Sequence, residues 1–188
     1  MLGMATVFVW LSLGQEALAA ANKNSGGTYE GQKDRRGRPH GEGTYRWNNG
    51  KVYVGEWRQS EASGKGKVIE PDGSSVEGNW LEGKPYGEVT KVTPSGERTV
   101  GTLTDGLLAG PAEVHLTNGD SYQGTWELGV RVGEVIYTFE NGDVYKGHFK
   151  DGKPHGSGDH TYVQTGNRFS GNFVATCRRG SKFLENCR

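Results

Sequence analysis

The fold is decided by the stretch YKGHFKDGKPHGSG at residues 145–158. In its first half, aromatic residues and a glycine alternate with polar residues, and its last residues again place a glycine at every second position. A period of two is typical of a β-strand with one apolar face, because successive side chains of a strand point to opposite sides. The stretch therefore predicts two short strands that pair as a β-hairpin.

Glycines recur with a fixed period through the chain. One series keeps a step of 23 residues, with a last step of 24, and consists of Gly50, Gly73, Gly96, Gly119, Gly142 and Gly166. A second keeps the step of 23 throughout and consists of Gly41, Gly64, Gly87, Gly110, Gly133 and Gly156. Asn, Asp, Ser or Thr precedes each glycine of the first series, and Asn-Gly and Asp-Gly predict hairpins with two-residue type I′ turns. We therefore expect about six hairpin units and a closing half unit.

Aromatic residues recur in phase with these glycines, mainly in the first strand of each unit. They are Tyr29, Tyr53, Trp57, Trp80, Tyr122, Trp126, Tyr145, Phe149, Phe169 and Phe173. A single hairpin cannot bury its own face, so successive hairpins are expected to stack, with inward glycines leaving room for the rings of their neighbours. The predicted fold is all-β, an elongated single-layer antiparallel sheet over residues 29–173. The unit with Thr99 and Leu103 in place of two rings should be the least stable.

The pattern Y-x-G-x-W-x-x-G-x-x-x-G-x-G resembles the MORN repeat (membrane occupation and recognition nexus), and the resemblance covers residues 29–173. In the three central units, Val89, Ala112 and Val135 replace the second glycine of the pattern. The resemblance implies stacked hairpins and a role in membrane attachment, scaffolding, dimerisation or the positioning of an adjoining catalytic domain.

Composition excludes several classes of protein. Glycine accounts for 32 of the 188 residues and hydrophobic residues for only 32%, which excludes a helical bundle and a polytopic membrane protein. The 22 basic residues balance the 22 acidic ones, so no nucleic-acid partner is expected. The charge is uneven along the chain, with a net +4 over residues 22–70, −6 over 71–130 and +3 over 131–188. Basic ends of this kind favour anionic partners.

Two basic clusters are the candidate contacts for such a partner. They are Arg35, Arg36 and Arg38 near the start of the array, and Arg178, Arg179 and Lys182 after its end.

The first 21 residues have a different character from the rest. Residues 1–13 are apolar and a run of small residues follows at 17–21, as in a secretory signal. No Lys or Arg precedes Lys23, so a retained short anchor is the alternative. We expect residues 1–21 to be a signal peptide or anchor and residues 22–28 a linker, with the array outside the cytoplasm, periplasmic or secreted, or otherwise membrane-anchored.

Cys177 and Cys187 are the only cysteines, and both follow the last predicted strand. In an exported protein such a pair is expected to form a disulfide. The bond would fasten residues 174–188 as a cap over the last edge strand. Unpaired thiols and metal ligation remain the alternatives.

No catalytic, cofactor or metal site is expected. His148, His155 and His160 lie near Asp151 and Asp159 in one unit, but no pair has a recognised ligand spacing. The expected function is that of a non-enzymatic interaction or scaffold module that binds another protein or a second copy of itself. The alternatives are a scaffold on anionic lipid, held by an uncleaved N-terminal segment, and a glycan or cell-wall binder that uses the aromatic face.

Overall fold

The computed structural model describes residues 26–150 and 153–173, so the predicted signal peptide and the Cys177–Cys187 cap lie outside the described residues. The described residues form thirteen strands and no helix. In chain order the strands are β1 (Gly27–Lys33), β2 (Pro39–Trp47), β3 (Val52–Arg58), β4 (Glu61–Ile69), β5 (Ser75–Leu81), β6 (Lys84–Val92), β7 (Arg98–Thr104), β8 (Leu107–His115), β9 (Ser121–Glu127), β10 (Val130–Thr138), β11 (Val144–Lys150), β12 (Lys153–Thr161) and β13 (Arg168–Phe173).

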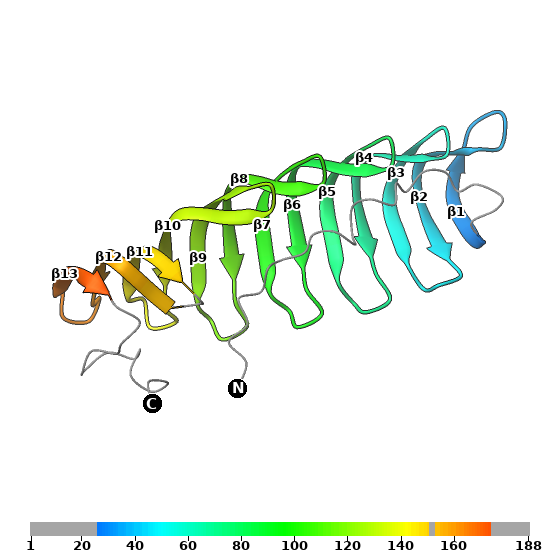
Figure 1. The fold of residues 1–188 in the computed structure, drawn as a ribbon. Coiled ribbons are helices and arrows are strands. Elements are labelled where there is room, and N and C mark those ends of the chain that lie inside the picture. The colour runs from blue at the N-terminus through cyan, green and yellow to red at the C-terminus, as the bar shows by residue number, and fades with distance from the viewer. Residues whose placement is uncertain (1–25, 151–152, 174–188) are drawn as a thin grey trace.

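All thirteen strands belong to one sheet, in which each strand pairs with the next strand of the chain. The ladders are antiparallel, and Figure 1 shows the hairpins standing side by side as an elongated row. The predicted all-β sheet of stacked hairpins is therefore confirmed. Its first strand begins earlier than predicted, because Gly27 already pairs with Trp47 of β2.

The turns that contain the first glycine series differ from the predicted type. Gly50 donates its N–H to the Trp47 carbonyl at 3.0 Å, and Trp47 donates its own to the Lys51 carbonyl at 2.9 Å. Gly50 has a φ of 91°, whereas Asn49 is not among the residues with positive φ. The loop is thus a type I turn followed by a left-handed glycine, and the two-residue type I′ prediction is wrong here. The cause is the Asn49 side chain, whose Oδ1 accepts the Lys51 N–H at 3.0 Å and closes the turn locally.

Type I′ turns occur at the opposite edge of the sheet. Both central residues have positive φ in the pairs Gln59-Ser60, Glu82-Gly83, Asp105-Gly106 and Leu128-Gly129. The predicted turn glycines, at the first edge, also all have a positive φ; they are Gly50, Gly73, Gly96, Gly119, Gly142 and Gly166. Two kinds of turn therefore alternate along the chain and collect on opposite edges.

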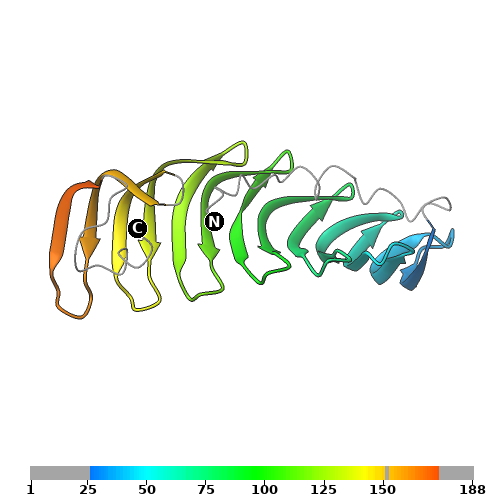
Figure 2. The same cartoon turned by 60° about the horizontal axis from the view of Figure 1, so that its bottom comes forward.

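The second glycine series bends the hairpins. Gly55 pairs with Gly66 and Trp57 with Ala62, so β4 carries two more residues than β3 across this bulge. Gly64 lies within the bulge with a φ of 65°, a conformation that favours glycine. Figures 1 and 2 show the hairpins bending over toward the edge with the type I′ turns. We call the part beyond the bulge the flap, which comprises residues 33–41, 57–64, 80–87, 103–110 and 126–133 in the first five hairpins.

The inward face is filled by rings that lie over glycines. Tyr53 is fully buried, and a Cβ built on Gly66 would overlap the phenol of Tyr53. The Tyr53 hydroxyl donates to the Glu56 carbonyl at 3.2 Å. Tyr29 covers Gly43 and Tyr145 covers Gly158 in the same way. The expectation that inward glycines leave room for rings is therefore confirmed.

Two tryptophans link the second and third hairpins to the hairpin before each of them. The indole N–H of Trp57 donates to the Gly43 carbonyl at 3.1 Å, and that of Trp80 donates to the Gly66 carbonyl at 2.9 Å. The ring of Tyr53 lies edge-on to both, with centroids 5.0 Å from Trp57 and 5.2 Å from Trp80. Aromatic pairs in this geometry add stability beyond the burial of their surface. The first three hairpins are thus joined by one continuous ladder of rings.

In the third and fourth hairpins, the ring and its glycine are both replaced. Val76 occurs with Val89, and Thr99 with Ala112, and all four side chains are buried. A Cβ built on Gly78 would lie 2.8 Å from Cγ1 of Val89, so an aliphatic group now occupies the space of the ring. Where the ring of Tyr53 is replaced by a smaller side chain, the glycine that it would cover is therefore replaced by a residue with a side chain.

The fifth hairpin keeps the ring and loses the glycine. Val135 is buried at that position, and the ring of Tyr122 stacks on Tyr137 with centroids 6.1 Å apart and planes 5° apart. The guanidinium of Arg131 lies 5.3 Å from the centroid of Tyr122, a cation–π arrangement.

The ring-over-glycine contact predicts the effect of one methyl group. Gly66→Ala should lower the free energy of unfolding by about 2 kcal/mol, because the new Cβ enters the space of the Tyr53 ring. Gly124→Ala is the control, since its Cβ would be no closer than 3.3 Å to the Trp126 ring. Urea denaturation followed by tryptophan fluorescence measures both variants. Equal losses in the two variants would show that glycine matters here for backbone freedom alone.

Lys91 predicts a stabilising substitution next to the unit expected to be least stable, because it pairs with Thr99 of that unit. Its side chain is 8% exposed, and burial lowers the pKa of its ammonium group, an effect that the charge of Asp72 opposes. Taking a charged group out of water costs free energy, and an apolar side chain of similar volume avoids that cost. We expect Lys91→Met to raise the free energy of unfolding by about 1 kcal/mol, while the exposed Lys84→Met changes it by less than about 0.5 kcal/mol. Lower stability of Lys91→Met in urea would contradict this.

Candidate interaction surface

The histidines singled out in the sequence lie at separate places in the described strands. Among residues 26–150 and 153–173, no three His, Cys, Asp or Glu side chains are grouped to hold a metal ion. His148 and His155 are register partners on β11 and β12, whereas His160 is buried between Phe139 and Tyr162, with ring centroids 5.7 and 4.3 Å away. Nor does this part of the chain contain a helix able to cross a membrane.

The predicted aromatic face is mostly packed core. Five of its residues are at most 4% exposed, namely Tyr53, Trp57, Trp80, Trp126 and Tyr145. Four are partly buried, namely Tyr29, Tyr122, Phe169 and Phe173, and the side chain of Phe149 lies outside the described residues. The buried rings are committed to one another, so a surface for a partner has to be sought elsewhere.

The outward side of the flaps carries four exposed apolar side chains. Leu81 is 56% exposed, Tyr86 49%, Leu128 78% and Val130 60%. They point outward because strand alternation sends Trp80 inward, next to Leu81. We call these four residues the apolar strip. Large exposed apolar groups gathered on one side of a sheet are typical of a contact surface.

The flaps are joined to one another by backbone hydrogen bonds. Ser60 donates its N–H to the Pro39 carbonyl at 2.9 Å, Gly83 to Ala62 at 3.0 Å, and Gly129 to Leu108 at 2.9 Å; all three donors lie in type I′ turns. These bonds join the first flap to the second, the second to the third and the fourth to the fifth. The apolar strip lies on the third and fifth flaps, with Thr104 and Asp105 exposed on the fourth flap between them.

A basic loop lies at the β1 end of the flaps, and Asp34 holds it. The carboxylate accepts the backbone N–H groups of Arg36 at 2.8 Å and Arg38 at 3.0 Å, and the Arg38 Nε at 2.8 Å. These hydrogen bonds, those from Arg38 foremost, lower the pKa of Asp34 to about 2. Arg38 is thus committed to Asp34, while Arg35 and Arg36 are exposed at the tip of the loop.

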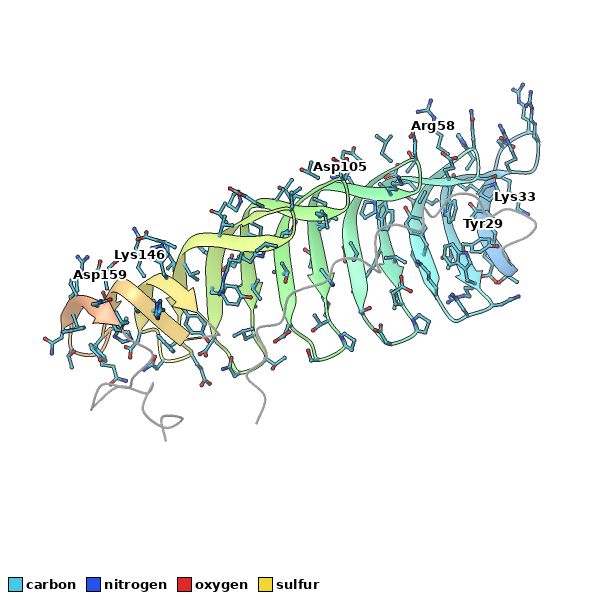
Figure 3. The ribbon with its side chains drawn as sticks, in the orientation of Figure 1. Tyr29, Lys33, Arg58, Asp105, Lys146 and Asp159 are labelled. Carbon is cyan, nitrogen blue, oxygen red and sulfur yellow. The ribbon has the colours of Figure 1, made fainter. Side chains whose placement is uncertain are left out.

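Further exposed basic residues adjoin this loop. Figure 3 shows Lys33 and Arg58 at the β1 end of the sheet, on the first and second hairpins. Arg35, Arg36 and Arg58 are exposed, and we call these three residues the basic corner. Lys33 is also exposed but pairs with Pro39 as Trp80 pairs with Pro85, so it lies on the inward side. The sequence-predicted contacts Arg35 and Arg36 therefore fall within one group, whereas Arg178, Arg179 and Lys182 lie outside the described residues.

The type I′ turns further along the row are acidic. Glu82, Asp105 and Glu127 are exposed in the turns, or next to the turns, of the third, fourth and fifth hairpins, and Figure 3 shows Asp105 at this edge. The outward side of the flaps thus changes from basic to apolar and acidic along the sheet.

A second candidate is a shallow hollow of about 500 Å³ on the polar face of β10 to β13. Its lining consists of Glu134, Lys146, Ser157, Gly158, Asp159, Ser170 and Gly171, and Figure 3 labels Lys146 and Asp159. Asp159 accepts hydrogen bonds from Arg168 at 2.7 Å and Ser170 at 2.5 Å, and Lys146 lies 4.0 Å from Glu134. The charged groups of the hollow are already paired with one another, so few of them are available to bind a ligand.

Sequence reasoning located the basic loop but missed the apolar strip. The available signal was an apolar residue at an outward position beside a type I′ turn, as with Leu81 after Trp80 and Val130 after Gly129. Because the turn type was assigned to the other glycine series, these positions were not recognised as neighbours on one edge.

Solved structures with some likeness to this sheet share little sequence with it. The TCP domain of Drosophila melanogaster SAS-4 (dCPAP), in complex with a proline-rich motif of Ana2, gives a TM-score of 0.48 at 11% identity over 76% of each chain. The G-box domain of the microcephaly protein CPAP gives 0.36 at 13% identity over 79% of this chain and all of that one. A mutant TCP10 domain of Danio rerio CPAP gives 0.29 at 17% identity over 79% and 80%. At these values the likeness does not extend to function.

Comparison with the curated proteins gives no match. The family model of the MORN repeat, in contrast, matches four stretches, at residues 29–52, 53–75, 122–144 and 145–164. The four stretches begin at Tyr29, Tyr53, Tyr122 and Tyr145. Residues 76–121, between the second and third stretches, have Val76 and Thr99 at the corresponding positions, although they keep the buried ring of Trp80. With its period, its glycines and its sheet of consecutive hairpins, the chain contains MORN repeats at these four stretches.

Proposed function

We propose that this protein is a non-enzymatic interaction scaffold that acts outside the cytoplasm and binds another protein on the outward side of its flaps. The apolar strip is the observation that carries the proposal, because four large apolar side chains, each about half exposed or more, lie there in two pairs, one on the third hairpin and one on the fifth. MORN repeats form protein-interaction or membrane-binding modules, which agrees with this assignment. Thirteen strands at a spacing of ~4.8 Å give a sheet roughly 60 Å long, enough for contacts at several points.

The other partners considered fit the surface less well. Stacking of a glycan requires exposed ring faces, whereas Tyr53, Trp57 and Trp80 are nearly fully buried. An anionic membrane would be attracted by the basic corner, but Glu82 and Asp105 in the same row of turns would repel it.

The location outside the cytoplasm rests on residues 1–21 and on the two cysteines. An apolar segment followed by small residues is typical of an export signal, and a cysteine pair is typical of an oxidising compartment. A chain held in a membrane by an uncleaved segment is the alternative location for the same scaffold.

The intact mass of the native protein, measured separately in the soluble and membrane fractions, tests this location. We expect native protein from the soluble extracytoplasmic fraction to lack residues 1–19 or 1–21, because the small-residue run offers cleavage at either point. Cys177 and Cys187 should resist alkylation until they are reduced. A full-length chain in the membrane fraction, with both thiols open to alkylation, would establish the anchored alternative instead.

Charge placed on the apolar strip tests the binding surface. Leu81→Glu combined with Leu128→Glu should abolish co-purification of the native partner after cross-linking, because an ionised carboxylate cannot be desolvated against an apolar contact. Both residues are more than half exposed, so the circular dichroism spectrum and the melting temperature should stay unchanged. Val163→Glu is the matched control, since Val163 is 57% exposed but lies in the turn between β12 and β13. Equal recovery of the partner with the unchanged chain, the double variant and Val163→Glu would refute the strip as the binding surface.

A further inference from the structure

We propose that the partner contributes an extended segment that is acidic at one end and apolar at the other, and that this segment lies across the flaps with its acidic end at the basic corner. This inference rests on the proposed function, because it specifies what occupies the same surface. It follows from the order in which charge and apolar area occur along the flaps.

The basic corner is fixed in place before any partner arrives. Asp34 closes the loop by accepting two backbone N–H groups, and its backbone N–H and carbonyl bond Arg38 and Gly37 at 2.9 Å each. Because Asp34 also neutralises Arg38 through a 2.7 Å ion pair, the exposed charges at the tip are those of Arg35 and Arg36. Two guanidinium groups on a pre-ordered turn favour carboxylates, which they can bind through paired hydrogen bonds.

The rest of the row sets the polarity of the segment. Beyond the corner, the outward side of the third and fourth flaps carries the apolar Leu81 and Tyr86, and the acidic Glu82 and Asp105. One basic residue, Lys84, lies among them as the register partner of Leu81. A chain that carried acidic residues along its whole length would be repelled there, as would an anionic bilayer. A segment with its carboxylates confined to one end meets only the basic corner with them, and it can place apolar side chains over the strip.

The spacing of the hairpins gives the length of the segment. The first and fifth hairpins are eight strand spacings apart, or about 38 Å. An extended chain covers that distance with about 11 residues. The nearest apolar residue of the strip, Leu81, is only one hairpin beyond Arg58, so the acidic and apolar parts of the segment can be adjacent.

A phage-displayed library of random 16-residue peptides, selected on the full chain, tests this chemistry. We expect enriched peptides with two or more acidic residues at one end and apolar residues toward the other. Fluorescence anisotropy should then show that Arg35→Glu with Arg36→Glu weakens binding about tenfold or more, and that added salt weakens it as well. Arg46→Glu is the control, because Arg46 is exposed on β2 outside the loop, and it should change the affinity less than about twofold.

The outcomes separate this inference from the proposed function. Enriched peptides that lack an acidic end, or that bind the Arg35→Glu and Arg36→Glu variant as tightly as the original, would overturn the inference. If those peptides still lose binding to Leu128→Glu, the strip remains the protein-binding surface. Peptide binding that is unchanged both in the Arg35→Glu and Arg36→Glu variant and in Leu128→Glu would overturn the inference and the proposed function together. Binding of vesicles with 30% phosphatidylserine that requires Arg35 and Arg36, without any enriched peptide, would assign the corner to a membrane instead.

Discussion

A ring laid flat over a glycine of the neighbouring strand is the contact on which this structure depends. A sheet of a single layer has no second layer to cover its apolar face, so Tyr53 is buried against its own sheet, and Gly66 must lack a side chain for that to happen. The indole of Trp80 then reaches the Gly66 carbonyl and joins the next hairpin to the same site. Each hairpin therefore completes the burial of the one before it, which is why the period recurs so strictly.

This way of building a core decides where a partner can bind. The inward face is occupied by its own rings, and the bulge at Gly64 bends the end of each hairpin into a flap. Within the flap, Trp80 still points inward and is buried, whereas the next residue, Leu81, points outward and is exposed to a partner. Outward positions beside the turns carry no part of the core packing, so their charge and polarity can vary from hairpin to hairpin while the backbone stays the same.

The sequence predicted the strands well because alternation and turn glycines are local features. It failed on the turn type, since Asn49 hydrogen-bonds the Lys51 N–H and keeps a negative φ, whereas Gln59 and Ser60 adopt positive φ without an Asn-Gly signal. The apolar strip was missed for a different reason. Whether Leu81 is covered or exposed depends on the bend of its hairpin and on the neighbouring flap. Neither can be predicted from the spacing of nearby residues.

The central hairpins show that departure from the repeat pattern is not loss of structure. Val76 with Val89, and Thr99 with Ala112, exchange a ring and its glycine for two aliphatic or small side chains, and the ladder of strands continues through them without a break. The paired exchange fills the same space, so the outward positions keep their alignment with those of the flanking hairpins. The stretch that the repeat model leaves unmatched, residues 76–121, is also where the apolar strip begins. Relaxing the inward pattern there leaves the row of flaps intact, so the apolar residues of the third and fifth hairpins still face a partner on the same side.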